Sequence, residues 1–417
     1  MALNHPPPLR LIIIALIVFI IGIVSISHHE SSPSWSRLSK SFVDNRASSS
    51  SSSSFSSHSP TYHGPSSISS LSLKDSKSHA HHDTLPKVHL FIPINQRFAY
   101  KDDVFCKSIQ SAIVNGWEPI LFNWELIHAE HKKEKIRGLQ KILSSSKYTS
   151  NFHDDDLIFM MDADVCLQLP PQVLAKRFVE EYDKKVLVAA EKNCSPNGKN
   201  THACLDAPPA PLIEELFWLS EEPHVLDLSE KLPTHANSGT VLGRFKKMKK
   251  FYNELVEFMK DDPFTDDDDQ HLFNEAVADR KVDLDFTARL FWPAGDDSAN
   301  FMFMNTPQSV QDDADPGITP WELYPPLGWH TLFGHPPVGI HFAGDVKDRK
   351  KEWWNKLWWA SHKRFRRIVR ERMDRGQVEF VEEDGYSRKT IQEVCPKLEV
   401  WDWDLLDTRE LHETEQA

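Results

Sequence analysis

The chain has 417 residues, of which 40% are hydrophobic, and a formal net charge of −13 at pH 7. This length accommodates one large domain or two ordinary ones. The negative charge argues against a general nucleic-acid-binding protein, because such a protein needs a basic surface to neutralise phosphates.

An uncharged apolar segment near the N-terminus, Leu11–Ile26, predicts membrane targeting. Its length is at the short end for a membrane-spanning helix, and a cleaved signal peptide is the alternative. No small-x-small cleavage site follows, which favours an uncleaved anchor over residues 11–27. Because Arg10 precedes the segment, residues 1–10 are expected in the cytosol, as in a type II membrane protein. A short span favours the thinner Golgi or endoplasmic reticulum membrane, with the rest of the chain in the lumen.

Residues 28–85 are rich in serine and are expected to form a disordered stem, because they contain too little apolar surface to bury. Order is expected from Pro86, in a domain over residues 86–360. Residues 361–417 are expected to form a basic helix, over 361–376, and an acidic tail. The basic helix is interpreted as a solvated face paired with acids, with an anionic ligand or lipid surface as the alternative.

Five cysteines are present, and a luminal location would permit disulfides. Cys194 and Cys204 lie ten residues apart in a segment typical of a loop, and they are the favoured pair. An odd number leaves at least one thiol free within the chain. No two cysteines have the spacing of a zinc site.

From Pro86, strand and helix patterns alternate along the chain, which predicts an α/β domain with a mostly parallel sheet flanked by helices. The segment 156–161 is nearly all apolar, as expected for a strand covered on both faces. The expected strands are 87–94, 117–122, 156–161 and 185–191, and the expected helices are 102–116, 129–146 and 170–183.

Two carboxylates, Asp162 and Asp164, follow this apolar strand directly. Open α/β sheets bind ligands beyond the carboxyl ends of their strands. An Asp-x-Asp pair at that position can direct both carboxylates at one hard cation such as Mg²⁺ or Mn²⁺. The alternative is a solvated acidic turn.

Three later motifs are candidate parts of the same site. Asp266–Asp269 and Gln270 precede an amphipathic segment; a helix N-terminus favours negative charge, but four acids exceed what a cap needs. Asn237–Ser238–Gly239 is expected to form a small polar turn that lets a substrate approach the backbone. His341 ends a strand-like run; a lone histidine is usually structural, but beside an Asp-x-Asp motif it is a candidate third metal ligand.

These motifs, in this order, resemble the glycosyltransferase domain of the procollagen lysyl hydroxylase / collagen glucosyltransferase family, which has the GT-A fold. The resemblance extends over about residues 87–345. It rests on the acidic motif after an apolar strand, Leu187–Pro196, Asn237–Gly239, Asp266–Gln270 and the histidine-glycine segment at His341.

The resemblance implies roles for these residues. Asp162, Asp164 and His341 would hold Mn²⁺, or Mg²⁺, on the diphosphate of a UDP-sugar. Asp268 and Asp269 would be catalytic, near the transferred sugar. The expected substrate-binding residues are Asn237, Ser238, Gly239, Gln270 and Lys135.

Two positions depart from the family pattern. The family has two residues between its metal-binding acids, whereas this chain has only Ala163. The family has an aromatic residue where this chain has Ser195, which affects the subsite for the sugar or the acceptor.

The expected function is therefore a type II membrane glycosyltransferase of the secretory pathway. It would transfer a hexose from a UDP-sugar to a protein or glycan acceptor, with a metal ion and with retention at the anomeric carbon. The first alternative is a phosphatase with Asp162 as nucleophile and Asp164 as acid/base. The second is a glycosyltransferase-like binding protein without catalytic activity.

Overall fold

The computed structural model describes residues 85–99, 104–126, 132–182, 185–210, 232–261, 268–295, 300–305, 326–346, 349–354, 356–361 and 365–396. The predicted anchor over residues 11–27, the stem up to residue 84 and the tail after residue 396 lie outside these ranges. Within these ranges, no helix is both long enough and apolar enough to cross a membrane.

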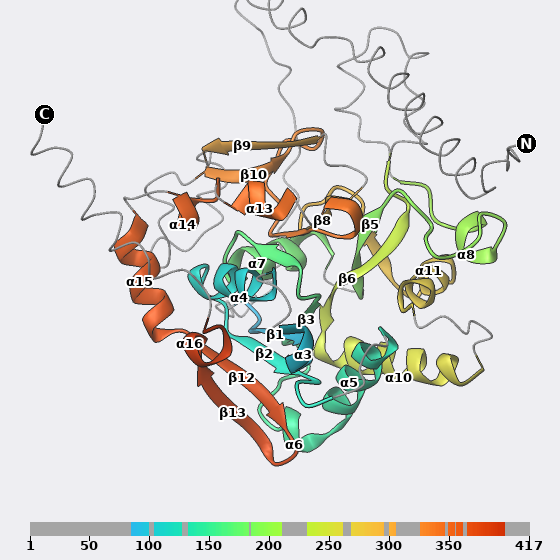
Figure 1. Ribbon diagram of the computed structural model, residues 1–417. Helices are drawn as coiled ribbons and strands as arrows, with labels where there is room; N and C mark the ends of the chain where they lie inside the picture. The colour runs from blue at the N-terminus through green and yellow to red at the C-terminus, as the bar shows by residue number, and fades with distance from the viewer. Residues whose placement is uncertain are drawn as a thin grey trace, which may run out of the picture. The chain divides into compact units, whose positions relative to one another are not determined.

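A central sheet of eight strands, in the order β13-β12-β2-β1-β3-β6-β5-β7, organises the described part of the chain (Figure 1). Parallel pairing joins β12 to β2, β2 to β1, β1 to β3 and β5 to β7. The predicted mostly parallel α/β sheet is confirmed, with β6 and β13 running antiparallel to their neighbours. The strands are β1 Val88–Pro93, β2 Pro119–Phe122, β3 Leu157–Met161, β5 Leu187–Glu191, β6 His235–Arg244, β7 Asp283–Asp285, β12 Gln377–Glu382 and β13 Gly385–Thr390.

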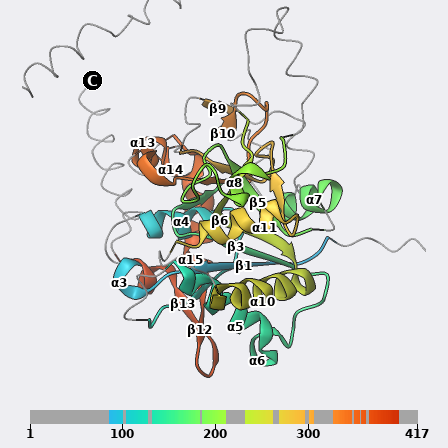
Figure 2. The same cartoon turned by 90° about the vertical axis from the view of Figure 1, so that its right-hand side faces the viewer.

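Helices cover both faces of this sheet, as Figure 2 shows from the side. Alternate residues of β3 point to opposite faces, as the period of a strand requires. Leu157 and Phe159 enter a core with α4 (Val104–Val114) and α7 (Pro171–Glu181). Ile158 and Met160 enter a second core with α5 (Lys133–Ser144) and α10 (Phe245–Asp261). Burial on both sides explains why this strand is apolar throughout.

A smaller sheet has the order β4-β11-β8, and its strand β4 follows β3 directly in the sequence. Its strands are β4 (Val165–Leu167), β11 (Gly339–His341) and β8 (Phe291–Pro293). β11 pairs antiparallel with β4, and the register places His341 opposite Val165. This pairing brings His341 beside the Asp162–Asp164 segment. β9 (Phe301–Asn305) and β10 (Pro326–His330) form a separate antiparallel pair.

The remaining helices are short, apart from α11 and α15. The basic helix predicted over 361–376 is observed as α15, Arg366–Arg375, and it buries Val369 and Met373 in the core with α4. The other helices are α3 Gln96–Ala99, α6 Ser146–Thr149, α8 His202–Leu205, α11 Gln270–Ala278, α13 Arg349–Trp354, α14 Trp358–Ser361, α16 Ile391–Val394 and the 3₁₀ turn Gly344–Val346.

Two disulfides are present among the described residues. The predicted bond between Cys194 and Cys204 is confirmed. A second bond, between Cys106 of α4 and Cys395 after α16, was not predicted. Cys166 of β4 stays a buried thiol, in agreement with the expected odd cysteine.

Candidate functional site

The two carboxylates of the Asp-x-Asp motif lie in a tight turn between β3 and β4. The amide of Asp162 donates to the carbonyl of Gly239 in β6 (2.8 Å), and the amide of Val165 donates to the carbonyl of Asp162 (3.2 Å). The turn is thus held by the neighbouring antiparallel strand at one end and by its own hydrogen bond at the other. This anchoring fixes both side chains at the carboxyl edge of the sheet, where the sequence analysis expects a ligand.

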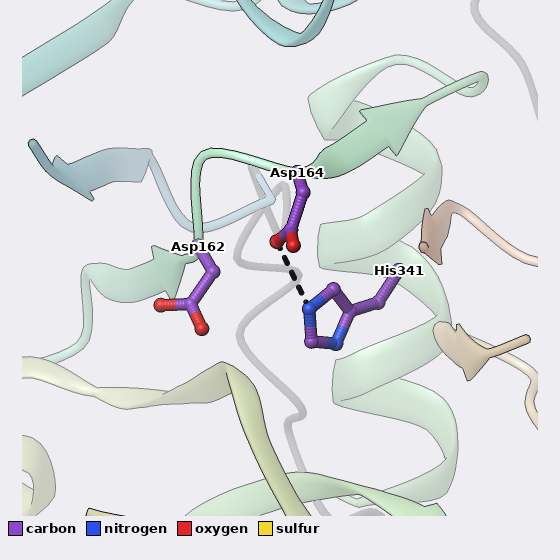
Figure 3. A group of neighbouring side chains, drawn as sticks. All are labelled: Asp162, Asp164 and His341. Atoms are coloured by element: carbon purple, nitrogen blue, oxygen red, sulfur yellow. Dashed lines mark hydrogen bonds and ion pairs between the residues drawn. The ribbon is translucent and has the colours of Figure 1, made fainter. Parts of the chain in front are cut away.

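His341 joins this turn, so that three side chains distant in the sequence meet (Figure 3). Its Nε2 lies 3.0 Å from Oδ1 of Asp164. Asp162, Asp164 and His341 each offer a ligand atom, and these atoms lie within 4.8 Å of one another. The predicted metal-ligand set is therefore brought together in space.

Gly239 gives His341 the space that it occupies. A Cβ atom built on Gly239 would lie 2.1 Å from Cε1 of His341, much closer than any real contact. The predicted turn over Asn237–Ser238–Gly239 is wrong, because these residues lie inside β6. The register of β6 against β5 shifts here, between Val188 and Ala189. Val188 pairs with Val241 but Ala189 pairs with Asn237, so an irregularity in the pairing with β5 stands where the turn was expected.

Asn237 contacts His341 on the side away from Asp164. Nδ1 of His341 lies 2.7 Å from Oδ1 of Asn237, and both side chains are buried. Burial opposes the charged imidazole, but the charge of Asp164 and its hydrogen bond outweigh burial and raise the pKa of His341. The substrate-binding role predicted for Asn237 stays a prediction, and the structure adds a contact between its side chain and His341.

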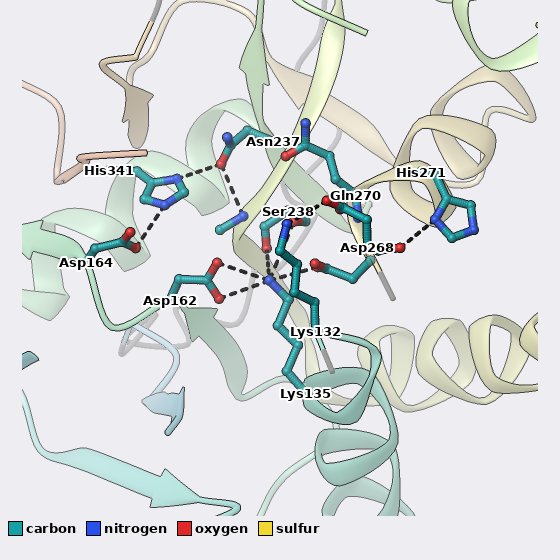
Figure 4. Close-up of polar contacts among 12 residues, drawn as sticks. Lys132, Lys135, Asp162, Asp164, Asn237, Ser238, Asp268, Gln270, His271 and His341 are labelled. Atoms are coloured by element: carbon teal, nitrogen blue, oxygen red, sulfur yellow. Dashed lines mark hydrogen bonds and ion pairs between the residues drawn. The ribbon is translucent and has the colours of Figure 1, made fainter. Parts of the chain in front are cut away.

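Lys135 of α5 lies buried beneath Asp162 (Figure 4). Its ammonium donates to both carboxylate oxygens of Asp162, at 2.9 and 3.0 Å, and to the carbonyl of Ser238 at 3.3 Å. It also forms an ion pair with Asp269 at 2.7 Å. Burial alone would lower the pKa of Lys135, but the two carboxylates outweigh it and raise the pKa. Lys135 and Ser238 thus support the metal-ligand turn. The substrate contacts predicted for both residues stay predictions.

Asp268 and Asp269 occupy different environments at the start of α11. Asp269 is 1% exposed, and burial raises its pKa. Asp268 is partly exposed; it pairs with Lys132 at 2.5 Å and accepts from the amide of Gln270 at 2.9 Å. Burial opposes its charge, but these hydrogen bonds outweigh burial and lower the pKa of Asp268. Asp266 lies outside the described residues.

Gln270 points to Glu191, which sequence reasoning did not select. Its Nε2 donates to Oε1 of Glu191 at 2.6 Å and to the carbonyl of Ser195 at 2.7 Å. Glu191 is the last residue of β5, at the same edge of the sheet as Asp162. The rule that predicts ligand binding at the carboxyl ends of strands would also have selected it.

The charges and atom types of this cluster suit a divalent cation. Carboxylate oxygens and one imidazole nitrogen are ligands that Mn²⁺ accepts, and Mg²⁺ accepts the carboxylates. Lys135 offsets one of the three negative charges on Asp162, Asp164 and Asp269. Carboxylates therefore outnumber ammonium groups in this cluster, and a divalent cation would offset the excess of negative charge.

Comparison with solved structures finds similarity to glycosyltransferases. One is a glycosyltransferase involved in glycosylation of the major capsid of PBCV-1, with 11% identity and a TM-score of 0.34 over 65% of this chain and 100% of that one. Another is the apo-form glycosyltransferase GlyE of Streptococcus pneumoniae TIGR4, with 12% identity and a TM-score of 0.36 over 70% of this chain and 64% of that one. No family model and no curated protein matches the chain. Similarity at this level does not identify a family, so the resemblance to collagen glycosyltransferases stays a prediction.

Proposed function

We propose that this protein is a metal-dependent glycosyltransferase that transfers a hexose from a UDP-sugar to a protein or glycan acceptor. The observation that carries the proposal is the convergence of Asp162, Asp164 and His341, at the carboxyl edge of a mostly parallel sheet. Carboxylates at such a site commonly hold a cation together with substrate phosphates, which is how a nucleotide diphosphate would be gripped.

When bound, a divalent cation offsets the charge that builds on the diphosphate as the glycosidic bond breaks. The chain's own residues prepare this site. Lys135 donates to both oxygens of Asp162, so the direction of this carboxylate is fixed. The hydrogen bond from the amide of Asp162 to the carbonyl of Gly239 keeps the turn in place. Little reorganisation is then needed when the donor binds.

Asp268 is the better placed of the two predicted catalytic acids. Glycosyl transfer leaves positive charge on the anomeric carbon in the transition state, as glycoside hydrolysis does. The pKa of Asp268 is lowered, so its partly exposed carboxylate is ionised at neutral pH and can stabilise that charge. Asp269 is buried against Lys135, which supports a role in holding the lysine rather than in contacting the sugar.

A location in the Golgi or endoplasmic reticulum, with a type II anchor and a luminal catalytic domain, completes the proposal. The apolar segment Leu11–Ile26 and the preceding Arg10 support the anchor and its orientation. The disulfides Cys106–Cys395 and Cys194–Cys204 support an oxidising compartment.

The contacts of Asp162 oppose the phosphatase alternative. A nucleophilic carboxylate must present an oxygen to phosphorus, but both oxygens of Asp162 accept hydrogen bonds from Lys135. Asp164, the acid/base in that alternative, lies against His341.

Release of UDP from a panel of UDP-hexoses, with Mn²⁺ or with EDTA, tests the proposed function in the purified full-length chain. Asp162→Asn and Asp164→Asn should each lower turnover at least about 100-fold, because each removes a charged ligand. Asp154→Asn is the matched control, since Asp154 is an exposed acid preceding the opposite end of β3. Full activity in either site variant, or in EDTA, would overturn the proposal. Phosphate release from a phosphomonoester without nucleotide sugar would favour the phosphatase.

A further inference from the structure

A line of hydrogen bonds leads away from His341 on the side opposite Asp164. Nδ1 of His341 meets Oδ1 of Asn237 at 2.7 Å, and Nδ2 of Asn237 donates to Oε2 of Glu191 at 2.8 Å. Nε2 of Gln270 donates to Oε1 of Glu191 at 2.6 Å. We call these four residues the Glu191 relay. They come from β11, β6, β5 and α11, so the relay joins four separate segments of the chain.

The neighbours of Asn237 determine which of its atoms is the oxygen. The backbone amide of Gly239 donates to Oδ1 at 3.1 Å, and a carboxylate oxygen of Glu191 faces Nδ2. An amide turned the other way would place donor against donor and acceptor against acceptor. Asn237 therefore presents its oxygen to His341, and Nδ1 of His341 carries a hydrogen.

This assignment leaves Nε2 of His341 as the nitrogen that can give up its hydrogen, now directed at Asp164, and bind a cation instead. Nε2 is also the atom that faces Asp164, at 3.0 Å. A metal-binding histidine requires one nitrogen free of its proton, and the hydrogen bond of the other nitrogen decides which one. The relay thus selects the imidazole form that the proposed site needs.

Glu191 is the residue that joins Asn237 and Gln270 in the relay. Each of its carboxylate oxygens accepts from one amide, Asn237 on one side and Gln270 on the other. Asn237 is 2% exposed, so water does not readily replace a lost partner. Gln270 has a second acceptor in the carbonyl of Ser195, whereas the orientation of Asn237 depends on Glu191 and Gly239.

We propose that Glu191 is a positioning residue that, through Asn237, holds His341 with Nε2 ready for a divalent cation and also secures Gln270 at the start of α11. This inference rests on the proposed function, because it assumes that Asp162, Asp164 and His341 bind a metal. It assigns Glu191 a role that the sequence motifs do not indicate.

Exchanging the acid and the amide between positions 191 and 237 tests the relay. Asn237→Asp alone replaces the 2.8 Å hydrogen bond between Asn237 and Glu191 with a repulsive contact between two carboxylates. It should weaken Mn²⁺ binding about 10- to 100-fold, the usual effect of losing a residue that orients a metal ligand. Adding Glu191→Gln restores the two hydrogen bonds that join positions 237, 191 and 270. The introduced amide donates to the introduced carboxylate and still accepts from Gln270. The double variant should therefore bind Mn²⁺ within about threefold of the original chain or more tightly.

Isothermal titration of Mn²⁺ alone into the full-length chain gives the affinity without requiring a donor or an acceptor. Glu371→Gln is the matched control, because Glu371 forms an exposed pair with Arg367 on α15. Melting of each variant without metal shows whether it is folded. If Asn237→Asp does not fold, the double variant decides by itself, since it retains the hydrogen-bond pattern with the two side-chain types exchanged.

Rescue of Mn²⁺ affinity in the double variant supports the relay. If the original chain binds Mn²⁺ but the double variant is folded and binds at least about 10-fold more weakly, the relay is overturned while the proposed function stands. Unchanged affinity in Asn237→Asp alone overturns the relay as well. If the original chain takes up no Mn²⁺, the proposed function fails and the relay fails with it.

Discussion

At the scale of single residues, the site depends on a small side chain as much as on charged ones. Gly239 has no Cβ, and the imidazole of His341 fills the volume that a Cβ would take. The same residue accepts the amide hydrogen of Asp162 through its carbonyl. One glycine in a strand thus sets the positions of a carboxylate and a histidine from two other segments. A glycine inside a strand often marks a place where another group approaches the backbone closely.

Replacement of this glycine gives a prediction that does not alter any charged group. Gly239→Ala places a methyl group 2.1 Å from Cε1 of His341, so the ring must leave its present position beside Asp164 and Asn237. We expect at least about a 10-fold loss of Mn²⁺ affinity, measured by isothermal titration, as for the loss of an orienting contact. Gly198→Ala is the control, because its Cβ would make an ordinary 3.6 Å contact with Thr201. Equal Mn²⁺ affinity in Gly239→Ala and the original chain would show that His341 is not a ligand.

At the scale of elements, the C-terminal part of the described chain completes the central sheet. β12 pairs with β2 in parallel, and β13 pairs with β12 at the sheet edge. α15 packs on α4 through Val369 and Met373. The disulfide between Cys106 and Cys395 then ties α4 to the residue after α16, across 289 positions. These elements hold α4 and β2 in place; within the sheet, β2 lies on the far side of β1 from β3.

The two disulfides should therefore contribute unequally to stability. In the chain-entropy account a cross-link stabilises more when it closes a longer loop. Cys106→Ala with Cys395→Ala should cost about 3–5 kcal/mol of unfolding free energy, and Cys194→Ala with Cys204→Ala about 2–3 kcal/mol. Urea unfolding under non-reducing conditions measures both. A larger loss of unfolding free energy on removal of the Cys194–Cys204 bond than of the Cys106–Cys395 bond would contradict the prediction.

At the scale of the whole molecule, several buried or partly buried histidines make stability depend on pH. Burial lowers the pKa of His89, His235 and His335, and for His335 it lowers the pKa to about 3, with Arg289 and Arg177 adding to the effect. A histidine with a lowered pKa stays neutral in the folded chain while the unfolded chain takes up a proton. Stability is then lost as pH falls below the unfolded pKa of 6.5.

This sign predicts how one substitution changes the pH profile. His335→Gln removes the proton uptake of the unfolded chain at this position, so the loss of stability between pH 7 and pH 5 should shrink by up to about 2 kcal/mol. His202→Gln is the control with the opposite sign. The pKa of the exposed His202 is raised by hydrogen bonds to Asp206 and Asp279, so this histidine stabilises the folded chain at low pH. Urea unfolding at several pH values measures both, and an unchanged profile in His335→Gln would refute the prediction.

The sequence by itself determined the features that depend on residues close together along the chain. The apolar run before Asp162 predicted a strand buried on both faces. Successive side chains of a strand point to opposite faces, and in this run both faces are apolar. The spacing of Cys194 and Cys204 predicted their bond, since a ten-residue loop closes readily. The acidic motif predicted a metal site with His341 as a candidate third ligand, and the structure brings these three side chains together.

Only the tertiary structure decided which side chains face one another across the site. Lys135 meets Asp162 because α5 packs on the sheet face to which Ile158 and Met160 of β3 point. Packing between segments that are distant in the sequence leaves no local sequence pattern. The antiparallel pairing of β6 with β3 and β5 placed Asn237 inside a strand rather than in a turn. Glu191 was overlooked for the same reason: its partners, Asn237 and Gln270, lie 46 and 79 residues further along the chain.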